Sequence, residues 1–334
     1  MFLIEFFISN CEFKFNLQST MRATSPQWSA GTQMQFIPPY QNQGFQQNQY
    51  RQSEVINNVK KLTMSPSDRA EALHTLSAQR ESIPELAVLL WESPGTITAL
   101  LYEILSIYPH LMATSTGSNN AHLSLNVRLA TRVCHVLALL QCVAGNDQTR
   151  LKFIKANIPM YLFPFLHTTN QSHECECFKL TSLGILGSLV KAEQSEIIKY
   201  LLQNEFVPLC LRILKFGQLM SRIVAAFIVQ KILSDQEGRN YVCANNERLE
   251  TVLSVLNIVL NYLAANFNVR LSKNVVQSYK YLLSESNVKE IAAKMNLEKL
   301  RKAPLDQVSD EVFVEFVHEL LSLNNAGMNT PRTA

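Results

Sequence analysis

The segment "RVCHVLALLQCVAGNDQTRLKF", residues 132–153, places two cysteines and a histidine in a run that is otherwise rich in Leu, Val and Ala. A thiol beside an imidazole is a pair that nucleophilic catalysis can use. On a helix, however, Cys134 and Cys142 share one side with Leu137 and Ala138, whereas His135 points roughly 100° away from Cys134. Cysteine packs there as a small apolar residue. The pattern therefore predicts packing and no reactive thiol.

A second group of candidate ligands lies in "HTTNQSHECECF", residues 167–178, where His167, His173, Cys175 and Cys177 could surround a zinc ion. Structural zinc sites characteristically pair their ligands two to four residues apart. A Cys-x-Cys pair with two irregularly spaced histidines fits that rule poorly. We expect a polar loop between helices here and no bound metal.

Other catalytic signatures are absent from the sequence, which has no Gly-x-Ser-x-Gly elbow, no Gly-rich phosphate loop and no His-Glu-x-x-His. Carboxylates such as Glu71, Glu81, Glu85 and Glu103 are spread among lysines and arginines, as on solvated helix faces. We therefore predict that the protein is not an enzyme and needs no cofactor.

The segment "NVRLSKNVVQSYKYLL", residues 268–283, puts Arg270, Lys273 and Lys280 at helical spacing, with Tyr279 and Tyr281 between them. Such a face could contact phosphates beside stacking rings, although basic residues on a helix are usually just its solvated side. The net charge of +3 is too small to attract polyanions in general. Weak binding of RNA or single-stranded DNA at Arg270 and Lys273 is kept as an alternative.

The elements that would position these residues are helices. Beyond Gln52 apolar residues recur three and four apart in runs of ten or more, with little period-two alternation, so the chain is predicted to be all-α. Helices are expected to start at Ser65 to Asp68 and at Ser93 to Thr96, where capping residues stand. Prolines are expected to separate helices at positions 84, 109, 159 and 208.

An internal repeat is visible when the chain is aligned on apolar residues that close a helix, namely Val143, Val190, Leu233 and Leu283. These anchors lie 47, 43 and 50 residues apart, and each is followed by further apolar residues eight and ten positions later. This period is typical of armadillo and HEAT repeats, whose two or three helices stack on their neighbours. The predicted fold is an α-solenoid with a groove lined by the same helix of each repeat.

The domain prediction is a Gln/Asn-rich disordered tail over residues 1–51, a repeat domain over 52–323 and a second tail over 324–334. The opening "MFLIEFFISNCEFKFNLQSTM" contains Glu5 and lacks a basic start and a cleavage site, so neither export nor a membrane anchor is expected. Met21 is a candidate start. The seven scattered cysteines favour reduced thiols inside the cell.

Several stretches resemble one family more specifically than any pattern: "RESIPELAVLLWESPGTITALLYEILSIYP", "RVCHVLALLQCVA", "IPMYLFPFLHT", "LTSLGILGSLVKAE", "VPLCLRIL" and "FIVQKILSDQEG". They are similar to the "required for cell differentiation" family, the armadillo-repeat subunit of the Ccr-Not mRNA deadenylase complex. The resemblance implies about six armadillo repeats in a right-handed superhelix. It also implies a non-enzymatic adaptor that binds the large scaffold subunit and short motifs of RNA-binding or silencing proteins.

The family's peptide groove corresponds to Cys177, Gly184 and Val224 in this sequence. Cys177 and Gly184 are seven apart and so share a helix face, and Val224 follows one repeat later. A glycine would let a ligand helix approach closely; the alternative is that Gly184 serves only helix packing. The family usually has an aromatic residue where Cys177 stands.

Scaffold docking in the family uses the face that here carries Glu92, Pro94, Thr98 and Leu105, although the family tends to have His and an aromatic at the first two positions. The pockets that take tryptophans from silencing proteins correspond to Asn246, Arg248, Asn287 and Ile291, of which only Arg248 keeps the family type. The segment 110–131 is longer than usual, with a polar middle typical of a loop. These departures indicate a diverged member.

The resemblance implies a cytoplasmic location, including processing bodies, with a nuclear pool as an alternative. No membrane partner is expected. Pairing of the protein with itself as a homodimer is left open.

Overall fold

The computed structural model describes residues 42–115, 126–285, 288–289, 291, 297–302 and 310–328. The chain divides into two compact units, residues 1–48 and 49–334, and the helices from Pro66 onward belong to the second. Residues 1–41 of the predicted N-terminal tail lie outside the described residues, whereas helix α2 (Asn42–Lys61) begins within that tail. At the other end α18 (Glu311–Met328) extends into the predicted C-terminal tail, of which 329–334 are not described.

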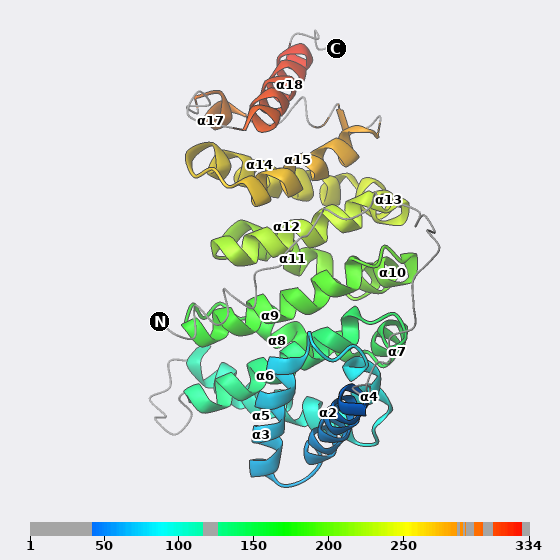
Figure 1. Cartoon of the computed structure of the whole chain (residues 1–334). Coiled ribbons are helices and arrows are strands. Elements are labelled where there is room, and N and C mark those ends of the chain that lie inside the picture. Colours follow the sequence, from blue (N-terminus) through cyan, green and yellow to red (C-terminus); the bar gives the residue numbers. More distant parts are fainter. Residues whose placement is uncertain are drawn as a thin grey trace, which may run out of the picture. The chain divides into compact units, whose positions relative to one another are not determined.

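The described residues contain helices and no strand, and the helices form three ladders in which each member packs on the next (Figure 1). The first ladder contains α3 (Pro66–Gln79), α6 (Val127–Gly145), α9 (His173–Val190), α12 (Leu219–Ser234), α15 (Val269–Leu283) and α18. The second contains α5 (Thr96–Ser115), η2 (Ile158–Leu162) with α8 (Phe163–His167), α11 (Phe206–Phe216), α14 (Asn246–Ala265) and α17 (Glu298–Arg301). The third contains the short helices α7 (Arg150–Lys155), α10 (Ser195–Gln203) and α13 (Gln236–Cys243); α4 (Leu86–Glu92) precedes α5.

The repeat read from the sequence marks the junctions between these helices. The anchors Val143, Val190, Leu233 and Leu283 lie in the last turn of α6, α9, α12 and α15 respectively. The apolar residues eight positions after the first three anchors lie in the short helices α7, α10 and α13. Each unit is therefore a short helix followed by a second-ladder and a first-ladder helix, which confirms the predicted α-solenoid.

Helix starts follow the local capping chemistry. Ser65 caps α3, its hydroxyl oxygen accepting a hydrogen bond from the Asp68 amide at 3.3 Å, and α5 starts at Thr96, both as predicted. The prediction for Pro109 was wrong, because this proline lies inside α5. Pro109 has no amide hydrogen to donate to the Leu105 carbonyl one turn earlier. Both residues are on the exposed side of α5, where water can satisfy that carbonyl.

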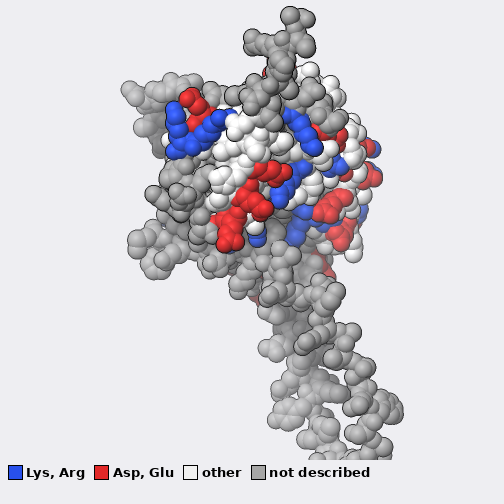
Figure 2. All heavy atoms as spheres, turned by 90° about the horizontal axis from the view of Figure 1, so that it is seen from above, with Lys and Arg blue, Asp and Glu red and all other residues white. Residues whose placement is uncertain are grey.

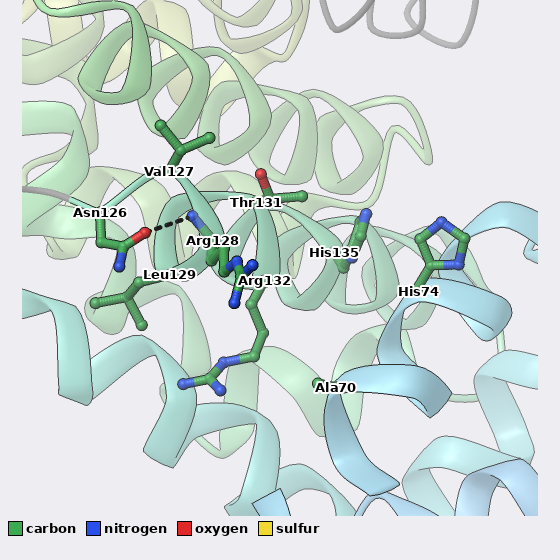
Figure 3. A pocket seen from close by; sticks show the side chains of 9 residues that line it. All are labelled: Ala70, His74, Asn126, Val127, Arg128, Leu129, Thr131, Arg132 and His135. Atoms are coloured by element: carbon green, nitrogen blue, oxygen red, sulfur yellow. Dashed lines mark hydrogen bonds between the residues drawn. The ribbon is translucent and has the colours of Figure 1, made fainter. Parts of the chain in front are cut away.

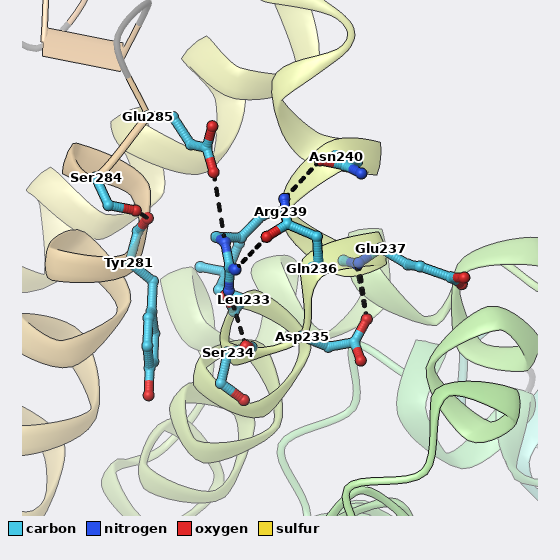
Figure 4. Close-up of polar contacts among 11 residues, drawn as sticks. Leu233, Ser234, Asp235, Gln236, Glu237, Arg239, Asn240, Tyr281, Ser284 and Glu285 are labelled. Carbon is cyan, nitrogen blue, oxygen red and sulfur yellow. Dashed lines mark hydrogen bonds and ion pairs between the residues drawn. The ribbon is translucent and has the colours of Figure 1, made fainter.

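Arginines close several helix ends. The last carbonyls of a helix have no partner within it, and near the start of the next helix an arginine donates to them. Arg150 of α7 donates to the carbonyls of Ala144 and Gly145, at 3.2 and 2.6 Å. Figure 4 shows the same arrangement at the junction of α12 and α13, where Arg239 of α13 donates to the carbonyls at the end of α12. Neighbouring repeats are thus joined by charge-assisted hydrogen bonds as well as by apolar packing.

Two helices, α6 and α14, are long and apolar enough to cross a membrane by length and composition alone. Both are packed into the solenoid, and their inward residues, such as Leu137 and Leu256, are buried against neighbouring helices. Core helices of a repeat protein meet the same criterion.

Candidate functional site

The predicted peptide groove lies on two helices that pack directly on each other. Cys177 and Gly184 are on α9 and Val224 is on α12. We call this surface, defined by those three residues, the trough. Ser172 caps α9, and the Glu176 carboxylate then accepts the Ser221 hydroxyl of α12 at 2.5 Å, which ties the two helices together.

Gly184 is in close contact with the preceding repeat. A Cβ at this position would lie 3.3 Å from both Nε2 and Oε1 of Gln141 on α6. The Gln141 amide in turn donates to the Ser188 hydroxyl at 3.4 Å, and that hydroxyl donates to the Gly184 carbonyl at 3.0 Å. Gly184 is buried, and the Gln141 amide is the group nearest to the position that a Cβ of Gly184 would occupy. A side chain at Gly184 would therefore push Gln141 aside and change the trough next to α6.

Gly187 borders the trough beside Val224 and was not singled out from the sequence. A Cβ there would lie 3.8 Å from Val224 and 3.9 Å from Phe227, so Gly187 and not Gly184 is the glycine that faces α12. The three-residue spacing of the two glycines in "GILG" is the signal that could have found it, because small residues allow helices to approach closely. The trough therefore has a glycine against each neighbouring helix.

The predicted scaffold face is exposed at all four positions, Glu92, Pro94, Thr98 and Leu105. The Glu92 carboxylate pairs with Lys152 Nζ at 2.6 Å on the surface. Tyr102, which no sequence pattern singled out, is 68% exposed and lies one turn from both Thr98 and Leu105. We call Pro94, Thr98, Tyr102 and Leu105 the α5 stripe.

Buried ion pairs hold α5 in place beneath this stripe. The expectation of a solvated Glu103 was wrong, because its side chain is only 4% exposed. It accepts a hydrogen bond from Arg69 of α3 at 2.9 Å and forms an ion pair with Arg132 of α6, whose Nε is 2.7 Å from the carboxylate. A carboxylate that is buried in this way needs such partners, since an unpaired buried charge is strongly destabilising. The stripe therefore stands on a helix fixed to both flanking helices.

The residues matched to tryptophan pockets are only partly described. Asn246 and Arg248 lie in the first turn of α14, Ile291 is half-buried beyond α15, and Asn287 lies outside the described residues. The Arg248 guanidinium stacks on Tyr241, 3.7 Å from the ring centroid, and donates to the Tyr241 carbonyl. Arg248 is thus already engaged in holding the α13–α14 corner.

The basic segment on α15 is exposed at Arg270, Lys273 and Lys280. The expectation that Tyr279 offers a stacking ring was wrong, because this side chain is fully buried and its hydroxyl donates to the Leu253 carbonyl at 3.3 Å. Burial raises the pKa of the Tyr279 hydroxyl well above its usual value. Tyr281 is half-buried and faces Arg239.

The cysteines pack as predicted for the opening segment. Cys134 is 4% exposed in the core, and burial raises the pKa of the half-buried Cys142 thiol. Burial likewise raises the pKa of Cys210 to about 12. These shifts oppose the thiolate form that a nucleophile needs.

Two of the suspected zinc ligands lie together on α9, where Cys177 Sγ is 3.6 Å from His173 Nε2, whereas Cys175 and His167 lie apart from them. The polar loop is shorter than expected, since α9 begins at His173 and contains both Cys175 and Cys177. Cys175 is fully buried, and the His167 ring lies against Arg212, 3.3 Å from its guanidinium. Within the part of the chain that the structure describes, no three His, Cys, Asp or Glu residues form a group that could hold a metal ion.

These features define an armadillo-type repeat protein with binding surfaces on its helix faces. Solved structures with the same fold include a designed armadillo repeat protein, YIII(Dq)4CqI, with a TM-score of 0.54, 16% identity and coverage of 81% of this chain and 100% of that one. A computationally designed armadillo protein for modular peptide recognition gives a TM-score of 0.52, 15% identity and coverage of 80% and 99%. At such low identity these matches show the fold alone.

Residues 58–323 match the model of the Rcd1-like cell differentiation family. The chain is 43% identical over 246 residues to cell differentiation protein rcd1 of Schizosaccharomyces pombe, covering 73% of this chain and 83% of that protein. It is 39% identical over 248 residues to Protein CAF40 of Saccharomyces cerevisiae, covering 74% and 64%. The chain belongs to the Rcd1-like cell differentiation family.

Proposed function

We propose that this protein is a non-catalytic adaptor subunit of the Ccr-Not mRNA deadenylase complex. In this function the α5 stripe, with Glu92, binds the large scaffold subunit, and the trough captures short peptide motifs of RNA-binding or silencing proteins. Capture brings the bound mRNA to the deadenylase and promotes its decay and translational repression. We place this activity in the cytoplasm, including processing bodies, with a nuclear pool.

The observation that carries the proposal is the exposed stripe on α5 in a chain of this family. Tyr102 and Leu105 are 68% and 43% exposed, and they lie on one side of a helix whose buried side is fixed by Glu103. Large apolar side chains presented on a rigid helix are the kind of anchor that protein interfaces use. The trough is bounded by close helix packing, since Gly184 lies against Gln141 of α6 and Gly187 against Val224 of α12.

Affinity purification of the full chain in reducing buffer tests the proposal, with the copurifying subunits identified by mass spectrometry. The wild-type chain is expected to recover a helical scaffold subunit and a deadenylase. Leu105→Glu should remove both, because a charge would be buried in the interface without a partner. Ile258→Glu is the matched control, since Ile258 is also exposed, at 37%, but lies on α14.

Two outcomes would contradict this assignment. The first is a wild-type purification that contains no scaffold and no deadenylase. The second is recovery that Leu105→Glu and Ile258→Glu reduce equally, because the loss would then not come from the α5 stripe.

The second candidate function is direct binding of single-stranded nucleic acid, as a transcriptional cofactor, through Arg270 and Lys273. Their exposure on α15 favours it, whereas the buried Tyr279 removes one stacking ring. Figure 2, viewed from the α17–α18 end, shows basic and acidic side chains interspersed over the described surface. Binding of this kind should fall steeply with salt and with Arg270→Glu, whereas peptide capture should respond to Gly184→Trp.

A further inference from the structure

A hollow at the α3–α6 end of the first ladder has an apolar lining that is interrupted by arginine and histidine side chains (Figure 3). We call it the α3–α6 hollow. It contains two arginines, two histidines and a threonine hydroxyl, whereas no Asp or Glu lines it. Its lining comprises Ala70, His74, Asn126, Val127, Arg128, Leu129, Thr131, Arg132 and His135. None of these residues belongs to the trough or the α5 stripe.

Arg132 is held in place by an ion pair with Glu103 of α5. Its Nε pairs with Glu103 at 2.7 Å, and the same carboxylate is shared with Arg69, so two guanidinium groups surround one carboxylate. This triad has a net charge of +1. Arg132 keeps 31% of its side chain exposed and is one of the residues that line the hollow (Figure 3). A guanidinium fixed in this way loses little freedom when it binds a ligand.

Arg128 and His74 also line the hollow. Arg128 is exposed one turn before Arg132 on α6, and among the described residues no carboxylate pairs with it. His74 of α3 is exposed and meets the half-buried His135 of α6 edge to face, with ring centroids 5.4 Å apart. The two imidazoles and two guanidiniums therefore come from both helices that border the hollow.

We propose that the α3–α6 hollow binds a phosphate monoester, as a phosphoserine or phosphothreonine side chain of a partner protein. A phosphomonoester carries nearly two negative charges and three acceptor oxygens. The guanidiniums of Arg128 and Arg132 and the imidazoles offer more donors than the two oxygens of a carboxylate can accept, which favours the three acceptor oxygens of a phosphomonoester. The site adds a second contact to the proposed adaptor but does not depend on capture by the trough.

The test is a titration of the full-length chain with a short phosphoserine peptide, followed by the NMR signals of the His74 and His135 rings. These signals are expected to shift in a saturable way, and the unphosphorylated peptide should leave them in place. Arg128→Gln is expected to weaken binding by about tenfold, because one charge-assisted contact is lost. Lys155→Gln makes the same charge change on α7, outside the hollow, and should bind like the wild type.

His74→Gln provides a second test. His74 and Arg128 are both exposed, so neither substitution should disturb folding. Equal affinity for the unphosphorylated peptide, or unchanged affinity in both variants, would overturn the inference. Tighter binding of a short single-stranded oligonucleotide than of the phosphopeptide would also overturn it, since the hollow would then be a phosphodiester site.

The trough variant separates this inference from the proposed function. Gly184→Trp should leave phosphopeptide binding intact while it removes capture of unmodified motifs. If Gly184→Trp abolishes phosphopeptide binding while the ring signals of His74 and His135 in the free variant stay at their wild-type positions, the phosphate site is the trough and the assignment to the hollow fails, although the adaptor function stands. If the scaffold does not copurify but the phosphopeptide still binds, the adaptor function fails and the hollow stands.

Discussion

His135 is the residue of α6 whose ionisation is most affected by folding. Burial, followed by the nearby His74 and Arg80, lowers the pKa of His135 from 6.5 to about 4. Between these two values the unfolded chain binds the proton and the folded chain does not. Acid therefore favours unfolding, and we expect the free energy of unfolding to fall by about 1–3 kcal/mol from pH 7 to pH 4.5.

Urea denaturation at a series of pH values measures this effect, with His135→Gln as the comparison. Glutamine keeps a polar side chain of similar length but does not titrate, so the variant should lose less stability over the same pH range. The other titrating residues are common to both proteins and cancel in the difference. Parallel pH profiles for the two proteins would show that His135 is not the responsible group.

Arg248 bears on whether tryptophan motifs of silencing proteins are bound. Its guanidinium already stacks on Tyr241, and Asn246 beside it offers no ring. Each missing stacking or cation–π contact is worth about 0.5–2 kcal/mol. A peptide with Gly-Trp motifs should therefore bind feebly or not at all in a calorimetric titration. Micromolar affinity would contradict this expectation.

Single residues differ in how far their roles could be predicted from the sequence. Cys134 was placed correctly, since its apolar neighbours at helical spacing decide its burial. Tyr279 was not, because a tyrosine between lysines fits either face, and only the register of α15 against α14 turns its hydroxyl to Leu253. The spacing of Gly184 and Gly187 marks both as positions of close helix packing, but it does not say that Gly187 is the one that faces α12.

Arg239 makes a testable contribution at the scale of the element. Its NH1 donates to the carbonyls of Leu233 and Ser234 at 2.9 and 2.8 Å, and its Nε lies 3.5 Å from a Glu285 oxygen after α15 (Figure 4). Arg239→Met keeps much of the packing but leaves the two carbonyls at the end of α12 without this donor. We expect a loss of about 1–3 kcal/mol in the free energy of unfolding, measured by urea denaturation.

Arg270→Met is the control for this variant. Arg270 is exposed on α15, so its substitution should change stability by less than about 0.5 kcal/mol. Equal losses in the two variants would indicate that α12 does not depend on this donor. A thermal scan of both variants gives an independent comparison.

The elements themselves were largely predictable, and for a physical reason. An armadillo unit buries its apolar face only against its neighbours, so the same apolar positions recur, and the anchors Val143, Val190 and Leu233 report each junction. Pro109 was misread, because a proline pattern does not reveal whether the lost hydrogen bond faces water. The periodicity of apolar residues predicts which face of each helix is buried. It does not predict which ligand or protein binds the exposed face.

At the scale of the whole repeat unit, the scaffold face and the trough lie on different ladders. The α5 stripe belongs to the second ladder and the trough to the first, and they are connected through α6, which packs on both α5 and α9. This connection consists of buried apolar side chains and the Glu103 ion pairs. Rearranging a close-packed interior of this kind costs free energy, and a ligand can select a second state only through a difference in its affinity for the two states.

We therefore expect the two surfaces to bind independently. The affinity of a trough peptide should change by less than about twofold when the scaffold segment is bound, because coupling requires a ligand that distinguishes two states of the protein. Isothermal titration of the peptide with and without saturating scaffold segment measures this ratio. Leu105→Glu should abolish scaffold binding without altering the peptide affinity, and Gly184→Trp should do the reverse. A change of more than about tenfold in either cross-measurement would show that α6 transmits a rearrangement between the ladders, and that the repeats move as a coupled unit.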